Sequence, residues 1–345
     1  MRLKCLFFVF CFFLLSVTSV YCLYLITPVP QTRYSAVGQE NVSISDTAKA
    51  PSSAADSTSK SSAEQNSSQK SSAVNTAANQ SAVGKIIQKS ISHSAANNVY
   101  RQAAVKNTTS KTINVQQLLK TGPELRLKKT NDPQVLIVHT HTTECYMNEE
   151  RDYYTKSDNT RSTNNQNNMV AVGEVLKDGL IKKNIGVIHA CEQHDYPEYT
   201  GSYNRAAATI KKYLQKYPTI KVVIDLHRDS IMNDDKSKTA LVSNINGKKA
   251  AQIMLVAGCQ DGEVSGFENW EENLKLSLKL QQTAETMYPG LTRPILFTAR
   301  KYNLNITTGS MLIECGTEAN TLDQAKYSAE LLANALSATL NMLKS

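Results

Sequence analysis

The chain has 345 residues, a formal net charge of +8 at pH 7 and an isoelectric point near 9.0. Such a charge suits a polyanionic neighbourhood, for example a membrane surface or an anionic cell wall. Aromatic residues make up only 7% of the chain and no arginine-rich stripe is present, so the composition argues against a role in binding nucleic acid.

The N-terminal segment is apolar and carries no charge between Lys4 and Ile26. About 20 apolar residues are enough to cross a membrane as a helix. A cleaved signal peptide is the competing interpretation, but its apolar core is shorter, about 7–15 residues, and precedes a cleavage site of small residues. We therefore expect residues 1–27 to be a retained signal anchor. Arg2 and Lys4 should stay in the cytoplasm, which places the rest of the chain outside it.

Residues 28–114 are dominated by Ser, Ala, Asn, Gln and Thr. They offer too little apolar surface to offset the entropy of ordering, so we expect a disordered tether. Within this segment, residues 84–91 (GKIIQKSI) are expected to form a local helix at most. The folded part is expected to comprise residues 115–345.

Strand and helix patterns alternate after residue 115. Apolar runs predict strands at 134–139, 185–190, 220–227, 295–302 and 310–316, and helical periodicity predicts helices at 168–184, 203–217, 270–288 and 321–344. Asn246-Gly247 separates two β-rich runs, which is a strong signal for a two-residue hairpin. Because apolar strands alternate with helices, the sequence predicts an α/β fold. We expect a single three-layer domain with a mixed, mostly parallel sheet flanked by helices.

Polar side chains follow three of the predicted strands, in LIVHTHTTE, VVIDLHRDS and MLIECGTE. Ligands of open α/β sheets collect at the carboxyl ends of the strands. His139 and His141 share a face if the strand continues, but only one of them reaches the site if the chain turns at Thr140. Imidazoles and carboxylates are the ligands that catalytic zinc prefers. We therefore expect a zinc site with candidate ligands His139, His141, Glu144 and His227.

The remaining candidates surround this predicted zinc site. Glu314 ends an apolar run where an unpaired carboxylate is costly, so we expect it to serve as general base and then general acid. Arg228 and Asn168 are expected to contact the substrate, although Arg228 could instead form a plain surface pair with Asp229. Ser230 lacks the Gly-x-Ser-x-Gly context of an activated nucleophile, which argues against a serine hydrolase.

The motifs HTHTTECY, RSTNNQNNMVAVGEVL, DLHRDS, MLVAGCQ and GSMLIECGTEANTLDQA together resemble the stage II sporulation protein P family of endospore-forming bacteria. The resemblance covers about residues 121–345. It implies an amidase-like fold and a zinc-dependent hydrolase acting on the glycan strands and stem peptides of peptidoglycan. Family members act as N-acetylmuramoyl-L-alanine amidases, are also described as cutting peptide cross-links, and work during forespore engulfment. The implied partners are the membrane-anchored stage II sporulation proteins D and M.

The resemblance also assigns roles to individual residues. His141 and His227 correspond to the ligand histidines of the related amidases, and Glu314 corresponds to their catalytic glutamate. A zinc peptidase that acts on the cross-links alone and a metal-free scaffold that binds the wall are the alternatives.

The expected ligand set departs from the related amidases at one point. Their ligand glutamate opens the helix after the first strand, where this chain has Asn167 and Asn168. Either Glu144 replaces that glutamate, or His139 joins His141 in binding the metal. The sequence leaves both possibilities open.

Overall fold

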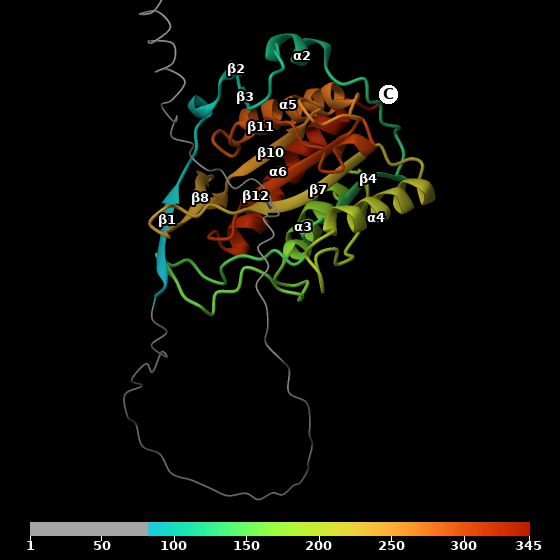
Figure 1. Ribbon diagram of the computed structural model, residues 1–345. Coiled ribbons are helices and arrows are strands. Elements are labelled where there is room, and N and C mark those ends of the chain that lie inside the picture. Colours follow the sequence, from blue (N-terminus) through green and yellow to red (C-terminus); the bar gives the residue numbers. More distant parts are fainter. Residues whose placement is uncertain (1–81) are drawn as a thin grey trace, which may run out of the picture. The chain divides into compact units, whose positions relative to one another are not determined.

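The structure is a computed structural model that describes residues 82–345. Its main sheet contains eight strands in the order β2-β3-β11-β10-β12-β7-β4-β6 (Figure 1). Their bounds are β2 Asn98–Tyr100, β3 Ala103–Asn107, β4 Pro133–Val138, β6 Gly186–His189, β7 Val222–Asp229, β10 Ile253–Gly258, β11 Ile295–Thr298 and β12 Ser310–Thr317. Strands β6, β4, β7 and β12 run parallel, β10 is antiparallel to β12, and β11 and β3 run parallel to β10. The predicted mixed, mostly parallel sheet is confirmed.

A second, smaller sheet has the strand order β5-β1-β8-β9. Its strands are β1 Gly84–Lys89, β5 Tyr153–Tyr154, β8 Lys238–Ile245 and β9 Lys248–Ala251. The predicted hairpin joins β8 to β9, with Ile245 opposite Lys248. Asn246 and Gly247 adopt φ values of 52° and 77°, and these positive values are what a two-residue turn of this kind requires.

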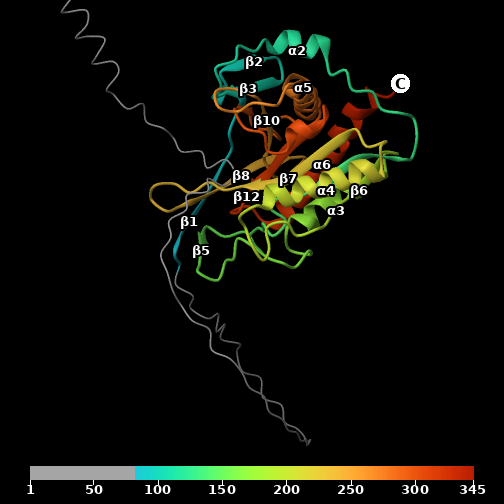
Figure 2. The ribbon, with the colours of Figure 1, turned by 45° about the vertical axis from the view of Figure 1, so that its right-hand side comes forward.

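Helices cover both faces of the main sheet (Figures 1 and 2). Helices α3, α5 and α6 pack together on one face, and α4 packs against β4 on the other. The helix bounds are α2 Val115–Thr121, α3 Met169–Ile181, α4 Ser202–Lys216, α5 Trp270–Met287 and α6 Leu322–Asn341, with short 3-10 turns η1 His93–Ala95 and η2 Leu304–Ile306. The described part is therefore an α/β domain of three layers, as the sequence predicts.

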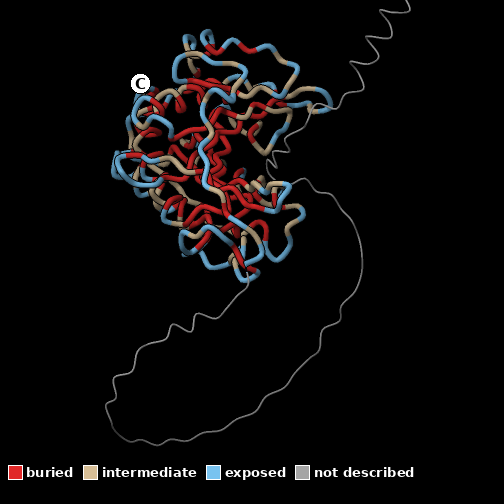
Figure 3. Tube along the Cα trace, turned by 90° about the vertical axis from the view of Figure 1, so that its left-hand side faces the viewer, coloured by how far each residue is buried: buried red, intermediate tan, exposed pale blue. Residues whose placement is uncertain are grey.

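Side chains along β4 alternate between the two faces of the sheet. Val135 and Ile137 belong to the core under α3, α5 and α6, whereas Leu136 and Val138 pack with Ile210 of α4. This alternation follows from the period of two in an extended chain. The buried residues form the interior between the layers (Figure 3). Odd-numbered residues of β4 thus face α3, α5 and α6, and even-numbered residues face α4. A residue that directly continues the strand follows the same alternation.

The expected boundary of the tether is wrong. Residues 84–89 form strand β1, which runs parallel to β8, and residues 103–107 form β3, which pairs with β11. Ala103, Ala104 and Val105 are fully buried. These short apolar runs complete sheets whose other strands come from distant sequence, so the polar average of the segment hides them. The expected anchor (1–27) and the first part of the tether (28–81) lie outside the described residues.

A chain that begins at Val115 is expected to be less stable than one that begins at Ala82. The shorter chain lacks the buried side chains of Ile86, Val105 and Ile113. Burying a Val or Ile side chain contributes about 1.5–3 kcal/mol. We expect the thermal midpoint to fall by roughly 10 °C or more, measured by circular dichroism at equal concentration. Equal midpoints would show that β1 to β3 contribute nothing to the fold.

Helices long and apolar enough to cross a bilayer are not found between residues 82 and 345.

Candidate active site

The candidate active site lies at the carboxyl ends of β4, β7 and β12, on the face of the sheet that α4 covers. His227 of β7 and Glu314 of β12 are neighbours in the register of these parallel strands, and both are completely buried. His141 and Glu144 come from the loop that follows β4 and are also buried. Residues from three separate segments thus converge at one edge of the sheet.

His141 lies beside the N-terminal end of α4. Its ring stacks on Tyr199 with a centroid distance of 4.7 Å, and the Tyr199 hydroxyl is 3.1 Å from its Nε2. The His227 ring meets it edge to face at 5.3 Å. Burial lowers the pKa of His141 to about 4, although the charge of Glu144 opposes that shift. The imidazole is therefore neutral at physiological pH, which is the form that binds a metal ion.

Glu144 lies between a histidine and an arginine. Its Oε2 is 3.7 Å from His227 Nδ1 and accepts a hydrogen bond from the Arg228 backbone N–H at 3.3 Å, and its Oε1 is 3.8 Å from Arg228 Nη1. Burial alone would raise the pKa of Glu144, but Arg228 and His227 outweigh burial and hold the pKa below its usual range. Glu144 is therefore ionised and available as an anionic ligand.

His227 lies between two carboxylates. Asp225 Oδ1 is 2.8 Å from its Nε2 and Glu144 Oε2 is 3.7 Å from its Nδ1, so each ring nitrogen faces a carboxylate. Asp225 is itself fixed by hydrogen bonds from the backbone N–H and the hydroxyl of Thr140, at 2.8 and 2.6 Å. Burial opposes protonation, but Asp225 and Glu144 raise the pKa of His227 well above its usual value. The two carboxylates stabilise a positive charge at this point.

Glu314 is a carboxylate without a hydrogen-bond partner in the described part of the chain. Both of its oxygens are fully buried. Burial, followed by the charge of Asp229, raises its pKa to about 8. The nearby Arg293 is already engaged, because its Nη2 donates to Asp229 Oδ2 at 2.9 Å. A buried carboxyl group with no partner is costly to the fold, so Glu314 remains a candidate for a chemical role.

His139 is not brought into this group. Its parity along β4 is that of Val135 and Ile137, so the ring lies on the α3 face of the sheet. There its Nδ1 donates to the Leu226 carbonyl at 2.8 Å and its Nε2 is 2.8 Å from His189 Nε2. A Cβ added to Gly173 of α3 would come within 2.7 Å of the same Nε2. His139 and His141 therefore lie on opposite faces because β4 ends at Val138 and the chain turns.

The two expected substrate contacts have other partners. Arg228 is buried, and its Nε and Nη2 donate to the carbonyls of Cys145 and Thr160 at 3.2 and 2.9 Å, so it holds the loop that carries Glu144. It is not a plain surface residue. Asn168 is the N-cap of α3, where its side chain accepts from Val170 N at 3.0 Å and donates to Ser162 O at 3.0 Å. Arg228 therefore fixes the loop that carries Glu144, and Asn168 fixes the start of α3.

Sequence reasoning missed three residues that the structure places at the site: Asp225, Arg161 and Tyr199. A signal existed for Asp225, because residues two apart in a strand share a face and Asp225 precedes His227 by two. Tyr199 belongs to the loop before α4, and Arg161 to the loop before α3. Nothing in the local sequence links either of them to the histidines.

The donors fit a zinc ion in kind. Two imidazoles and one carboxylate, from His141, His227 and Glu144, are a ligand set that catalytic zinc sites use. Within residues 82–345 no three such side chains already surround one point. The fit rests instead on the carboxylates of Asp225 and Glu144, which lie beside the two ring nitrogens of His227 and favour a cation there.

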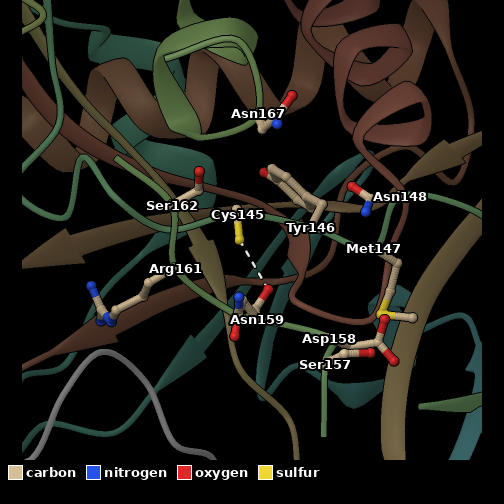
Figure 4. Close-up of a pocket in the computed structure, with 10 residues that line it drawn as sticks. All are labelled: Cys145, Tyr146, Met147, Asn148, Ser157, Asp158, Asn159, Arg161, Ser162 and Asn167. Carbon is tan, nitrogen blue, oxygen red and sulfur yellow. Dashed lines mark hydrogen bonds between the residues drawn. The ribbon is translucent and has the colours of Figure 1, made fainter. Parts of the chain in front are cut away.

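A polar pocket of about 180 Å³ adjoins the site (Figure 4). It lies within the loop between β4 and α3, which supplies all of its lining residues. Its lining residues are Cys145, Tyr146, Met147, Asn148, Ser157, Asp158, Asn159, Arg161, Ser162 and Asn167. The Cys145 thiol donates to the Asn159 carbonyl at 3.1 Å, which closes one wall. Cys145 follows Glu144 directly, so the pocket and the candidate ligands share a segment.

Solved amidases are among the structures to which this chain is similar. The N-acetylmuramoyl-L-alanine amidase AmiC2 of Nostoc punctiforme is 13% identical, with a TM-score of 0.34, over 61% of this chain and 96% of that chain. The CwlD amidase of Clostridioides difficile, solved in complex with the GerS lipoprotein, is 11% identical, with a TM-score of 0.37, over 61% of this chain and 98% of that chain.

Sequence comparison identifies the family. Stage II sporulation protein P of Bacillus subtilis is 26% identical over 220 residues, which are 60% of this chain and 51% of that protein, so the chain spans about half the length of the curated relative it matches. The resemblance inferred from the motifs is confirmed. The sequence model of stage II sporulation protein P matches residues 31–337, and the chain therefore belongs to that family.

Proposed function

We propose that this protein is a zinc-dependent peptidoglycan hydrolase of sporulation that cleaves the amide between N-acetylmuramic acid and the L-alanine of the stem peptide. The observation that carries the proposal is the buried and unpartnered carboxylate of Glu314, next to His227 in the sheet. Membership of the stage II sporulation protein P family supports the same conclusion.

The roles of the residues follow from their surroundings. His141, Glu144 and His227 would hold the zinc ion, and Asp225 and Arg228 would fix the positions of His227 and Glu144. Such an ion supplies Lewis acidity toward the carbonyl and lowers the pKa of water. A cation held by the three proposed ligands would lower the raised pKa of Glu314. The ionised Glu314 would then take a proton from the attacking water and deliver it to the amide nitrogen as the C–N bond breaks. The products are a free lactyl carboxylate on the glycan and a free amino terminus on L-alanine.

The cellular setting is part of the same proposal. Residues 1–27 would anchor the chain in the membrane, with the catalytic domain outside the cytoplasm during forespore engulfment. Stage II sporulation proteins D and M would be its partners, an expectation supported by the family alone. The net charge of +8 suits an enzyme that works between a membrane and an anionic wall.

Digestion of purified sacculi tests the proposed function. The full-length chain is incubated with sacculi, with and without a chelator, and the soluble fragments are identified by mass spectrometry. We expect chelator-sensitive release of stem peptides that carry free L-alanine amino termini. New termini only within the cross-links would establish a peptidase instead. Binding to sacculi without release of any fragment, with zinc added, would establish a scaffold.

A further inference from the structure

Arg161, Tyr199 and His141 form a stack at the mouth of the site. The guanidinium of Arg161 lies 4.7 Å from the centre of the Tyr199 ring, and the Tyr199 and His141 rings are stacked with their centroids 4.7 Å apart. His141 is only 2% exposed, whereas the Arg161 side chain is 40% exposed. The stack therefore links a buried candidate ligand to a cation that reaches solvent.

The guanidinium of Arg161 is hydrogen-bonded through Nη1, whereas Nη2 has no protein acceptor within hydrogen-bonding distance among the described residues. Its Nη1 donates to the buried carboxylate of Asp195 and to the Thr143 hydroxyl, the latter at 3.2 Å. Its Nη2 is 4.0 Å from Glu144 Oε1, which is beyond hydrogen-bonding distance. A guanidinium presents five N–H donors in a fixed plane and matches a carboxylate in two-point contact. The anchored Arg161 thus has donors left for an anion that approaches from solvent.

Arg161 is also a wall of the polar pocket (Figure 4). Amide and hydroxyl side chains dominate the rest of that wall, a chemistry that suits hydrogen bonding to a peptide backbone. The acidic residue of the lining, Asp158, is paired with Arg151 and so offers little repulsion to an anion. The pocket therefore offers hydrogen-bonding groups for a peptide backbone, and Arg161 in its wall lies next to the candidate ligand Glu144.

We propose that Arg161 is a specificity-determining residue that binds a carboxylate of the substrate peptide, while the adjoining pocket holds the peptide backbone. The substrate class is an acidic peptide whose free carboxylate lies close to the amide that is cut. The inference rests on the proposed function. It deepens that function by stating which feature of the stem peptide the enzyme recognises.

A matched pair of substrates tests this inference on the full-length chain. Both are muramoyl peptides of the same sequence, and they differ only in that the residue after L-alanine carries either a free α-carboxylate or a carboxamide. One charge-assisted hydrogen-bonded contact corresponds to about 10- to 100-fold in affinity. We expect the wild type to prefer the acid by about that factor in kcat/KM, mainly through KM. Arg161→Gln should bring the ratio close to one, and Arg161→Lys should restore part of it.

Arg126 provides the control. It lies between α2 and β4, outside the pocket, and its Nη1 donates to the carbonyls of Pro123 and Leu125 at 3.0 and 2.8 Å. Arg126→Gln therefore removes an anchored guanidinium without changing a charge in the pocket. It should leave the preference for the acid unchanged. Thermal unfolding of each variant separates a loss of recognition from a loss of folding.

Binding without turnover supplies a second readout. The metal-free full-length chain is titrated with each peptide and the heat of binding is measured by calorimetry. The wild type should bind the acid more tightly than the carboxamide, and Arg161→Gln should bind both peptides with the same affinity. If the wild type cleaves and binds both peptides equally, the role of Arg161 is wrong and the hydrolase stands. If sacculi and both peptides stay intact, the proposed hydrolase fails, and the binding titration alone decides whether Arg161 recognises the carboxylate.

Discussion

Replacement of Glu314 by glutamine is expected to reduce amide hydrolysis by about 10²- to 10⁴-fold, the range that a positioned general acid–base group contributes. Glutamine keeps the size of the side chain and cannot accept the proton of water. The zinc content should not change, because the proposed ligands His141, Glu144 and His227 are untouched. The measurement is release of free L-alanine amino termini from sacculi, paired with metal analysis of the same preparation.

Stability gives the Glu314 variant an independent signature. Both oxygens of the wild-type carboxyl are buried without a partner, so the native fold already carries their cost. The neutral amide should therefore leave the thermal midpoint unchanged or raise it, as happens when a strained functional group is removed. A variant that loses activity and stability together would indicate a structural role.

Glu318 is the matched control for Glu314. It follows β12, is only 4% exposed and also has one buried oxygen without a partner, while its other oxygen accepts from the Ser230 hydroxyl at 3.0 Å. Glu318→Gln should retain activity close to that of the wild type. Equal loss in both variants would mean that acidity in this region, rather than Glu314 itself, supports the reaction.

Local patterns were sufficient to predict the strands that carry the site. Apolar runs ending in polar residues correctly marked β4, β7 and β12, and the convergence of His141, His227 and Glu314 followed because parallel strands end at the same edge of a sheet. The Asn246-Gly247 turn was equally predictable, since few dipeptides adopt two successive positive φ values.

Long-range pairing was not predictable in the same way. Strand β1 forms because β8, about 150 residues later in the chain, and β5 on its other side supply its hydrogen-bonding partners. The short apolar run that contains Ile86 looks like part of a polar linker until that neighbour is known. The face occupied by His141 is a similar problem, because it depends on whether the chain turns at Thr140.

The ligand set is the second prediction with a large expected effect. Glu144→Gln is expected to weaken zinc binding by at least about 100-fold, because it removes the anionic member of the proposed three-ligand set. His139→Gln should retain zinc. The affinity is measured by competition with a chromophoric chelator, so the result does not depend on turnover. These opposite outcomes would settle the choice that the sequence leaves open.

His139→Gln should instead lower the stability of the metal-free protein. The ring is fully buried between the Leu226 carbonyl and His189, and loss of such a buried hydrogen-bonded group costs about 1–3 kcal/mol. Urea unfolding of the metal-free chain measures that cost. Loss of zinc in His139→Gln with unchanged unfolding would reverse the assignment and make His139 the ligand. The parity of β4 argues against that result, since a ring on the α3 face would have to pass through the sheet to reach His227.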